Sequence, residues 1–317
     1  MKSWLRRLAA GFVLALLGCS GGSSEREGRE LTRSVLVDGR LHAYALYIPP
    51  DAGALPPVVL ALHGGGSNVA GMDVLTSLHD AADRYGFVYL RPQGYDRELR
   101  GIRTWNAGSC CGEAETDGID HVAVIDAMLD DVDEVVRVDT QRIYATGHSN
   151  GGMMAYRLAC ELSHRIAAIA PNAAYLMNRD YDTLLQLPVF ACRPARTVPV
   201  LHLHGLADRC APFEGGQSQG PEGGQRPPVQ DSIDVWVSNN GCATPPAETY
   251  RNGDARCLTY SGCSAGADVT LCTIEGAGHT WPGSSRLAVE GVCGGSTTDD
   301  LRANDAIWSF FEDHPIP

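Results

Sequence analysis

The feature that most constrains the fold is a serine between two glycines, at a point where a strand pattern gives way to a helix pattern. Residues 147–151 read GHSNG, with the apolar run RIYAT (142–146) before them and MMAYRLAC (153–160) after them. A strand–turn–helix junction of this kind holds Ser149 in a sharp turn and exposes its hydroxyl above the sheet. The glycines are expected because side chains at their positions would clash across the turn. The alternative is a glycine-rich loop in which the serine caps a helix.

Strand and helix patterns alternate along the rest of the chain. The expected strands are a hairpin at 34–49 and the apolar runs 58–66, 87–94, 142–149, 166–173, 198–205 and 269–276. The expected helices cover 72–86, 121–137, 152–162, 231–240 and 299–313. This alternation predicts an α/β fold, in which a mostly parallel central sheet carries helices on both faces. There is no internal repeat and no sign of a second core, so we expect a single domain over residues 31–317.

The first residues of the chain predict export. Three basic residues (Lys2, Arg6 and Arg7) precede the apolar run 8–18, which is too short to span a bilayer and is typical of a secretory signal. The run ends in LLGCS, which resembles a bacterial lipobox with Cys19 as the lipid-bearing residue. We therefore expect a lipoprotein signal peptide at 1–18 and a flexible tether at 19–30, with the exported protein lipid-anchored at the bacterial cell envelope or secreted. The alternative is an ordinary signal peptide with an incidental cysteine.

Charge and composition exclude several classes of function. The net charge of −13, with no basic stripe to offset it, argues against nucleic acid as a partner. Lys2 is the only lysine, so Schiff-base chemistry, a lysine general base and a P-loop lysine are all excluded from the mature protein. We expect a monomer that needs no metal and no organic cofactor.

A serine nucleophile needs a base, and the base needs an acid to orient it. In this type of fold the three occur in the order Ser, Asp or Glu, then His. Asp208 lies just past the strand pattern 198–205, where catalytic groups gather in open α/β sheets, and His279 lies in a glycine-rich loop after a later strand. His202 and His204 precede that acid, so we expect them to be buried strand residues with satisfied hydrogen bonds. A zinc site in HLHGLAD is the alternative, but its H-x-H-x-x-x-D spacing has no third cluster nearby.

The oxyanion of a tetrahedral intermediate needs two backbone N–H donors. One is expected from Asn150, directly after the nucleophile. The other is expected from HGGG (63–66), at Gly65 or alternatively Gly66, because an uninterrupted glycine run lets the backbone approach a substrate closely.

Ten cysteines besides Cys19 form an even set in an exported chain, which predicts disulfides. Cys110 and Cys111 are neighbours about 3.8 Å apart between Cα atoms, below the usual range for a disulfide, so we expect them to pair elsewhere. The other expected pairings are Cys160 with Cys192, Cys210 with Cys293, and Cys242, Cys257, Cys263 and Cys272 among themselves. A bond between Cys210 and Cys293 would tie the loop of the acid to the loop of the base.

Five segments occur in the same order as in a known family: LHGGG, TWNAGSCCG, GHSNGGMMAYRLACE, HGLAD and GAGHTWPG. Together they resemble the secreted feruloyl esterase and polyhydroxybutyrate depolymerase group of serine esterases, from about residue 41 to residue 311. The resemblance implies an α/β-hydrolase fold, with Ser149, Asp208 and His279 as the catalytic triad. The group often has paired aspartates where this chain has Asp120 and His121. This departure leaves the triad intact.

The resemblance also implies hydrolysis of esters such as feruloyl groups on plant polysaccharide or its oligomers. Trp281 and Trp105 would then help to line an aromatic acyl pocket; the alternative is that both tryptophans are packing anchors. Other substrates in keeping with the group are polyhydroxyalkanoate oligomers and acetylated xylan. The non-enzymatic alternative is a surface-bound binding protein that kept the fold.

Overall fold

The computed structural model describes residues 27–97, 101–221, 223–284 and 293–317. The predicted signal peptide, Cys19 and most of the predicted tether lie outside the described residues. Within them, no helix is long and apolar enough to cross a membrane.

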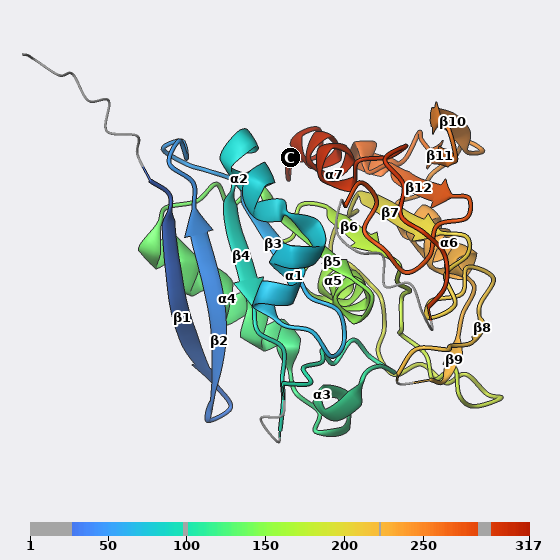
Figure 1. Cartoon of the computed structure of the whole chain (residues 1–317), viewed down its shortest axis with the longest axis horizontal. Coiled ribbons are helices and arrows are strands. Elements are labelled where there is room, and N and C mark those ends of the chain that lie inside the picture. The colour runs from blue at the N-terminus through green and yellow to red at the C-terminus, as the bar shows by residue number, and fades with distance from the viewer. Residues whose placement is uncertain (1–26, 98–100, 222, 285–292) are drawn as a thin grey trace, which may run out of the picture.

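One large sheet runs through the molecule (Figure 1). Its ten strands lie in the order β1-β2-β4-β3-β5-β6-β7-β12-β11-β10. Their bounds are β1 (Arg29–Val37), β2 (Arg40–Ile48), β3 (Val58–Leu62), β4 (Val88–Pro92), β5 (Ile143–His148), β6 (Ile169–Asn172), β7 (Val200–Gly205), β10 (Ala247–Asn252), β11 (Ala255–Tyr260) and β12 (Val269–Ile274). Neighbours from β4 to β12 pair in parallel, whereas β1 and β2 at one end and β11 and β10 at the other pair antiparallel. Every residue of β3 and β5 is buried, as expected for strands covered on both faces.

Helices cover both faces of this sheet, as the sequence predicts. Their bounds are α1 (Val69–Thr76), α2 (Leu78–Tyr85), α3 (Gly112–Thr116), α4 (His121–Val135), α5 (Asn150–Glu161), α6 (Val229–Asn239) and α7 (Ala303–Glu312). Alternate strand residues divide between two cores: Leu60 belongs to the core that includes residues of α4, α5 and α6, and Val59 belongs to the core that includes residues of α1, α2 and α7. This arrangement is the α/β-hydrolase fold.

Several local predictions are confirmed. The turn of the first hairpin lies at Asp38 and Gly39, both with positive φ, and Val37 pairs with Arg40 across it. Asp120 caps α4 by accepting a hydrogen bond from the amide of Ala123 at 3.0 Å.

Two predictions of secondary structure are wrong. The helix expected over 72–86 is two helices, because Ser77 adopts a left-handed conformation and ends α1. The β10–β11 hairpin (247–260) is absent from the expected strands, because all of β10 is exposed and its sequence lacks the apolar alternation of a half-buried strand. A small two-stranded sheet, β8 (Gly216–Gln217) and β9 (Gln225–Arg226), lies in the loop before α6.

Candidate functional site

Ser149 occupies the turn between β5 and α5 with φ 55° and ψ −124°. This backbone conformation is unfavourable for a residue with a side chain, and such strain is concentrated at functional sites. The first turn of α5 also directs its free N–H groups and the positive end of its dipole at this position. The turn therefore presents the Ser149 hydroxyl where negative charge would be stabilised.

The glycines around Ser149 are required by close backbone contacts. A Cβ on Gly151 would lie 2.0 Å from the carbonyl oxygen of Leu62, and a Cβ on Gly147 would lie 2.5 Å from the backbone of Gly151. The turn can only pack against the end of β3 when both side chains are absent. The steric reason predicted from the sequence is confirmed.

The HGGG loop lies beside the nucleophile. A Cβ on Gly64 would lie 3.6 Å from the Cβ of Ser149. The amide of Gly66 donates to the carbonyl of Arg103 at 2.8 Å, so it is not free to bind an oxyanion. Gly65 is exposed, and of the two candidates in this loop we retain its amide as the donor.

Trp105 links the two segments that hold the predicted oxyanion donors, the start of α5 at Asn150 and the HGGG loop. The side-chain amide of Asn150 makes two hydrogen bonds to the backbone of Trp105, accepting from its N–H at 2.7 Å and donating to its carbonyl at 3.0 Å. The indole N–H of Trp105 donates to the carbonyl of His63 at 2.8 Å. Trp105 is fully buried, so here it fixes the Asn150 and HGGG segments relative to each other. The structure favours the packing role over the acyl-pocket role.

Trp281 is also buried in this structure, at 1% exposure. Its indole N–H donates to the side chain of Asn304 at 2.9 Å. It contributes to the wall of a cavity shared with α2 and α7 rather than to an open acyl pocket.

The structure brings Asp208 and His279, the predicted acid and base, into contact. His279 Nδ1 donates to Asp208 Oδ2 at 2.7 Å, which leaves the lone pair of Nε2 free to accept a proton. The other oxygen, Oδ1, accepts from the amides of Cys210 at 2.9 Å and Ala211 at 2.7 Å. The Asp208 side chain is fully buried, whereas that of His279 is 13% exposed.

Ser149 and His279 lie at the same edge of the sheet, past the carboxyl ends of β5 and β12. The ring of His148, next to Ser149, packs against the ring of His279 with centroids 4.5 Å apart. The Ser149 hydroxyl makes no hydrogen bond to another described residue. In substrate-free enzymes the hydrogen bond between a catalytic serine and its histidine is commonly long, and it tightens when substrate binds.

Asn172, at the end of β6, links the two loops. Its carbonyl accepts from the amide of Ser149 at 2.9 Å. Its side-chain NH₂ donates to His148 Nδ1 at 2.8 Å and to the carbonyl of Thr280 at 2.9 Å. One buried residue thus fixes the nucleophile turn and the residue after His279. Sequence reasoning missed Asn172; the available signal was a polar residue at the end of an apolar strand pattern.

Burial keeps His148 neutral. Desolvation, followed by the neighbouring His279, holds the pKa of His148 well below its usual value. Because Nδ1 accepts from Asn172, His148 carries its proton on Nε2.

His202 and His204 are structural, as predicted. The carbonyl of Ala211 accepts from His204 Nε2 at 2.7 Å, so His204 Nδ1 must accept from His202 Nε2 at 2.9 Å. His202 Nδ1 then accepts from the hydroxyl of Tyr156 at 2.7 Å. Both rings are fully buried, and desolvation lowers the pKa of each. Each ring nitrogen in this chain of hydrogen bonds already has a partner, which argues against the zinc alternative.

No group of three or more metal-ligating side chains is arranged to hold a metal ion within the ranges that the structure describes.

Disulfides hold the surrounding loops. Cys210 is bonded to Cys293, as predicted, with Cα atoms 4.8 Å apart; this bond ties the loop of Asp208 to the segment after His279. The predicted pair Cys160–Cys192 is confirmed, and the remaining bonds of the strand-rich region are Cys242–Cys263 and Cys257–Cys272.

The prediction for the adjacent cysteines is wrong. Cys110 and Cys111 are bonded to each other. The expectation assumed a trans peptide with Cα atoms about 3.8 Å apart, whereas the peptide between them is cis and the Cα atoms lie 3.0 Å apart. The loop that contains them contacts the oxyanion region, because the amide of Cys111 donates to the carbonyl of Trp105 at 3.0 Å.

Comparison with known proteins agrees with this geometry. A sequence profile of the family described as "Esterase PHB depolymerase" matches residues 42–211, more than half of the chain. The chain is 32% identical over 280 residues to "Putative esterase NocK" of Nocardia uniformis subsp. tsuyamanensis, covering 82% of this chain and 77% of that protein. It is 33% identical over 182 residues to "Feruloyl esterase B" of Piromyces equi, covering 56% of this chain but only 31% of that longer protein.

Among solved structures, the acetyl xylan esterase from Aspergillus awamori superposes with a TM-score of 0.63. The two share 14% sequence identity, and the match covers 90% of this chain and 99% of the other. At this identity the likeness shows the fold alone. Taken together, the profile match and the relatives show that the chain belongs to the esterase PHB depolymerase family of carboxylic ester hydrolases.

Proposed function

We propose that the protein is a serine esterase that cleaves feruloyl and related aryl esters of plant polysaccharide or its oligomers through an acyl-enzyme. The observation that carries this proposal is the 2.7 Å hydrogen bond between His279 and Asp208, at the edge where the strained turn presents Ser149. The name of the relative from Piromyces equi supports the feruloyl assignment.

The first half-reaction forms the acyl-enzyme. Ser149 Oγ attacks the ester carbonyl while His279 Nε2 takes the hydroxyl proton, and Asp208 stabilises the imidazolium that results. The oxyanion accepts hydrogen bonds from the amides of Gly65 and Asn150, and a single donor of this type is commonly worth about 10²- to 10³-fold in kcat. The carbon–oxygen bond to the alcohol then breaks, and His279 returns its proton to the leaving alcohol.

The second half-reaction regenerates the enzyme. Water attacks the acyl carbonyl while His279 Nε2 removes its proton. The bond between the acyl carbon and Ser149 Oγ then breaks, His279 returns the proton to Oγ, and the acid product leaves. The residues present supply the acid, the base and the nucleophile, so this mechanism uses no metal or organic cofactor.

A polyhydroxyalkanoate oligomer or an acetylated xylan is the second candidate substrate. The polyhydroxyalkanoate is favoured by the description of the matched family, and the acetylated xylan by the name of a relative that is 24% identical over 274 residues, "Bifunctional acetylxylan esterase/xylanase XynS20E" of Neocallimastix patriciarum. A panel of methyl ferulate, p-nitrophenyl acetate and hydroxybutyrate oligomers separates the candidates. We expect the highest kcat/KM on methyl ferulate; a higher value on hydroxybutyrate oligomers would assign the second candidate instead.

A fluorophosphonate probe separates the enzyme from a binding protein that kept the fold. We expect the wild-type protein to be labelled and Ser149→Ala to remain unlabelled. A correctly folded wild-type protein that never labels would contradict the esterase proposal.

The five disulfides of the described residues support an extracellular location, because such bonds form and persist in oxidising environments. We propose in addition that Cys19 carries a lipid and that residues before the domain tether it to the cell envelope. Globomycin-sensitive processing and membrane fractionation test this: Cys19→Ala should release the protein into the soluble fraction. A wild-type protein that fractionates as soluble would contradict it.

A further inference from the structure

A long hollow outside the catalytic edge has no role in the ester chemistry. It is an open groove of about 750 Å³ between α7 and the antiparallel end of the sheet, β10 to β12. In Figure 1, β10 to β12 lie at one end of the molecule, and α7 lies between them and α2. We call it the α7 groove and define it by Thr249, Tyr250, Thr259, Thr270 and Phe310.

Three threonines from three adjacent strands form a row of hydroxyls along this groove. Thr249 Oγ1 lies 2.8 Å from Thr259 Oγ1, which lies 2.9 Å from Thr270 Oγ1. Two hydrogen bonds within the row use two of its three O–H donors, so one donor and several lone pairs are left for a ligand. The row therefore offers both donors and acceptors in a line across the sheet.

A β-bulge brings an aromatic ring to the same face. The pairing of β10 with β11 shifts between Glu248 and Tyr250, so Tyr250 pairs with Cys257, and both Thr249 and Tyr250 line the groove. Tyr250 is 38% exposed, and its hydroxyl donates to the carbonyl of Asp300 at 2.6 Å. This bond holds the ring in place, with an aromatic surface exposed to the groove.

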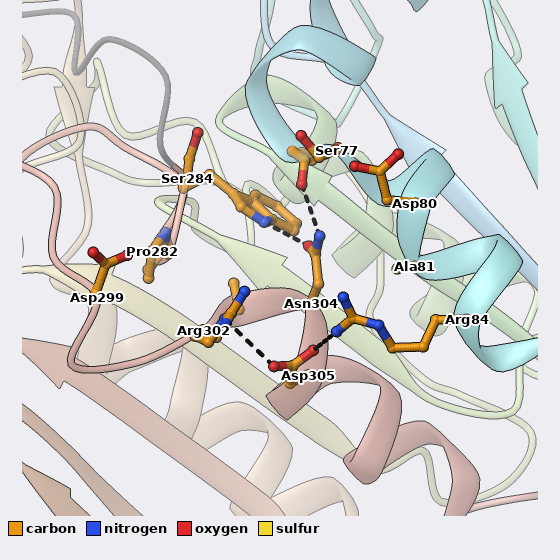
Figure 2. A pocket seen from close by; sticks show the side chains of 14 residues that line it. Ser77, Asp80, Ala81, Arg84, Pro282, Ser284, Asp299, Arg302, Asn304 and Asp305 are labelled. Carbon is orange, nitrogen blue, oxygen red and sulfur yellow. Dashed lines mark hydrogen bonds and ion pairs between the residues drawn. The ribbon is translucent and has the colours of Figure 1, made fainter.

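A second hollow of about 540 Å³ adjoins the groove, and the two share Asp299, Arg302 and Asp305 in their walls. Figure 2 shows Asp305 between two arginines, and its carboxylate lies 3.1 Å from Arg84 and 3.5 Å from Arg302. The wall on the other side is formed by residues 281–284. This segment begins two residues after His279, so the combined hollow extends toward the loop of the catalytic base.

From this lining we propose that the α7 groove binds a neutral oligosaccharide or polysaccharide chain. A pyranose ring has apolar C–H faces and a rim of hydroxyl groups, which match an exposed aromatic ring beside a row of hydroxyls and paired charges. The groove also has apolar walls, at Leu201, Leu301 and Phe310, which suit the C–H faces of a sugar ring. The threonine hydroxyls and aspartates set among them disfavour an alkyl chain, because burying them against it would leave them unpaired. The aspartates of the groove and the net charge of −13 disfavour an anionic polymer.

This inference deepens the proposed function and relies on it only for the choice of glycan. A xylan main chain in the groove would bring its ester side groups toward the edge that carries Ser149. Binding to the groove needs no catalysis, so it is measured separately from hydrolysis.

The test is binding of soluble arabinoxylan and xylohexaose to the Ser149→Ala protein, by affinity gel electrophoresis and calorimetry. We expect retardation by arabinoxylan and none by anionic polygalacturonate. Tyr250→Ala should weaken binding roughly fivefold or more, whereas Tyr250→Phe, which keeps the ring, should retain most of it.

Thr259→Val, made in the same background, removes the central hydroxyl at almost constant volume and should also weaken binding. Thr244→Val, at an exposed threonine outside the groove, is the matched control and should not. In the otherwise wild-type chain, Tyr250→Ala and Thr259→Val should leave kcat on p-nitrophenyl acetate unchanged.

Absence of glycan binding, or binding that none of the groove variants weakens, would overturn the inference even if the protein is an active esterase. Glycan binding that depends on Tyr250 and Thr259 in a protein that hydrolyses no ester would support the groove and contradict the proposed function.

Discussion

The parallel centre of the sheet and its antiparallel end are built in opposite ways. In the centre, β5, β6 and β7 are wholly buried, and polar groups at or near their ends are joined by hydrogen bonds, as at Asn172 and His204. At the end, β10 is exposed along its whole length, and the hydroxyls of Thr249 and Thr259 face an open groove. If both proposals hold, the centre fixes the geometry of the ester chemistry, while the end of the sheet leaves groups available to a ligand. Substitutions at the centre should therefore change rates, and those at the end should change binding.

Asp208→Asn should cause the largest loss of activity among substitutions in the parallel centre that spare the nucleophile and the base. Asparagine keeps an oxygen for the amides of Cys210 and Ala211, but it turns an NH₂ toward His279 Nδ1 and favours the wrong tautomer of the ring. We expect kcat on p-nitrophenyl acetate to fall about 10⁴-fold, the loss that this change produces in a serine-protease triad. A loss of less than tenfold in kcat, measured in a folded protein, would show that Asp208 is not the acid of the triad.

Asn172→Ala should cause the next largest loss, roughly 10²-fold in kcat. Without Asn172 the loops of Ser149 and His279 can shift, and small displacements of catalytic groups have effects of this size. Asn240→Ala is the matched control: Asn240 is also buried, and its NH₂ also donates to two groups, the carbonyls of Val198 and Ala267. These carbonyls precede the starts of β7 and β12, whereas Asp208 and His279 follow the ends of the same strands. Both variants should lower the melting temperature, and only Asn172→Ala should change kcat and the pH profile of fluorophosphonate labelling. If the two variants lower kcat equally, Asn172 has no specific role in positioning the catalytic residues.

Acid should destabilise the centre, since its histidines are buried in the neutral form. Burial lowers the pKa of His63 to about 4 and that of His121 to about 3, against an unfolded value of about 6.5. Below pH 6.5 the unfolded state binds more protons than the folded state, so the free energy of unfolding falls as the pH falls toward 4, by roughly 1.4 kcal/mol per pH unit for each such proton. Urea unfolding at pH 7.5, 6 and 5 measures this slope. A flat profile in that window would show that these histidines are protonated in the folded protein.

The smallest effect on the rate is expected from the disulfide beside the triad. Cys210→Ser with Cys293→Ser should lower the free energy of unfolding by about 2 to 4 kcal/mol and kcat by roughly tenfold. Cys160→Ser with Cys192→Ser removes a bond between other segments and should lower stability by a similar amount without changing kcat. If both double variants change kcat alike, the bond between Cys210 and Cys293 has no specific role in holding the site.

Sequence patterns predict the central strands and the pairing of Asp208 with His279 correctly. Apolar runs predicted the buried central strands, and chain order together with strand position selected Asp208 and His279, which lie 71 residues apart and are hydrogen-bonded in the structure. The same order excluded His202 and His204, which the structure places in a buried chain of hydrogen bonds.

The remaining features depend on contacts or conformations that no sequence pattern encodes. Asn172 is a single polar residue at the end of an apolar run, and its importance follows only from the loops that meet there. The exposed β10 strand has no apolar alternation, although the Gly253–Asp254 turn was a weak signal for its hairpin. The bond between Cys110 and Cys111 requires a cis peptide, which the sequence does not reveal. The sequence also does not separate an acyl pocket from packing as the role of Trp105 and Trp281, which the structure buries.

The most direct test of the account is to trap the acyl-enzyme. The wild-type protein, quenched in acid during turnover of methyl ferulate, should carry a feruloyl group on the peptide that contains Ser149, detected by mass spectrometry. His279→Ala should accumulate far less of it, because the base that activates the serine is gone. A feruloyl group on another residue, or turnover without any acylated peptide, would contradict the assignment of Ser149 as the nucleophile.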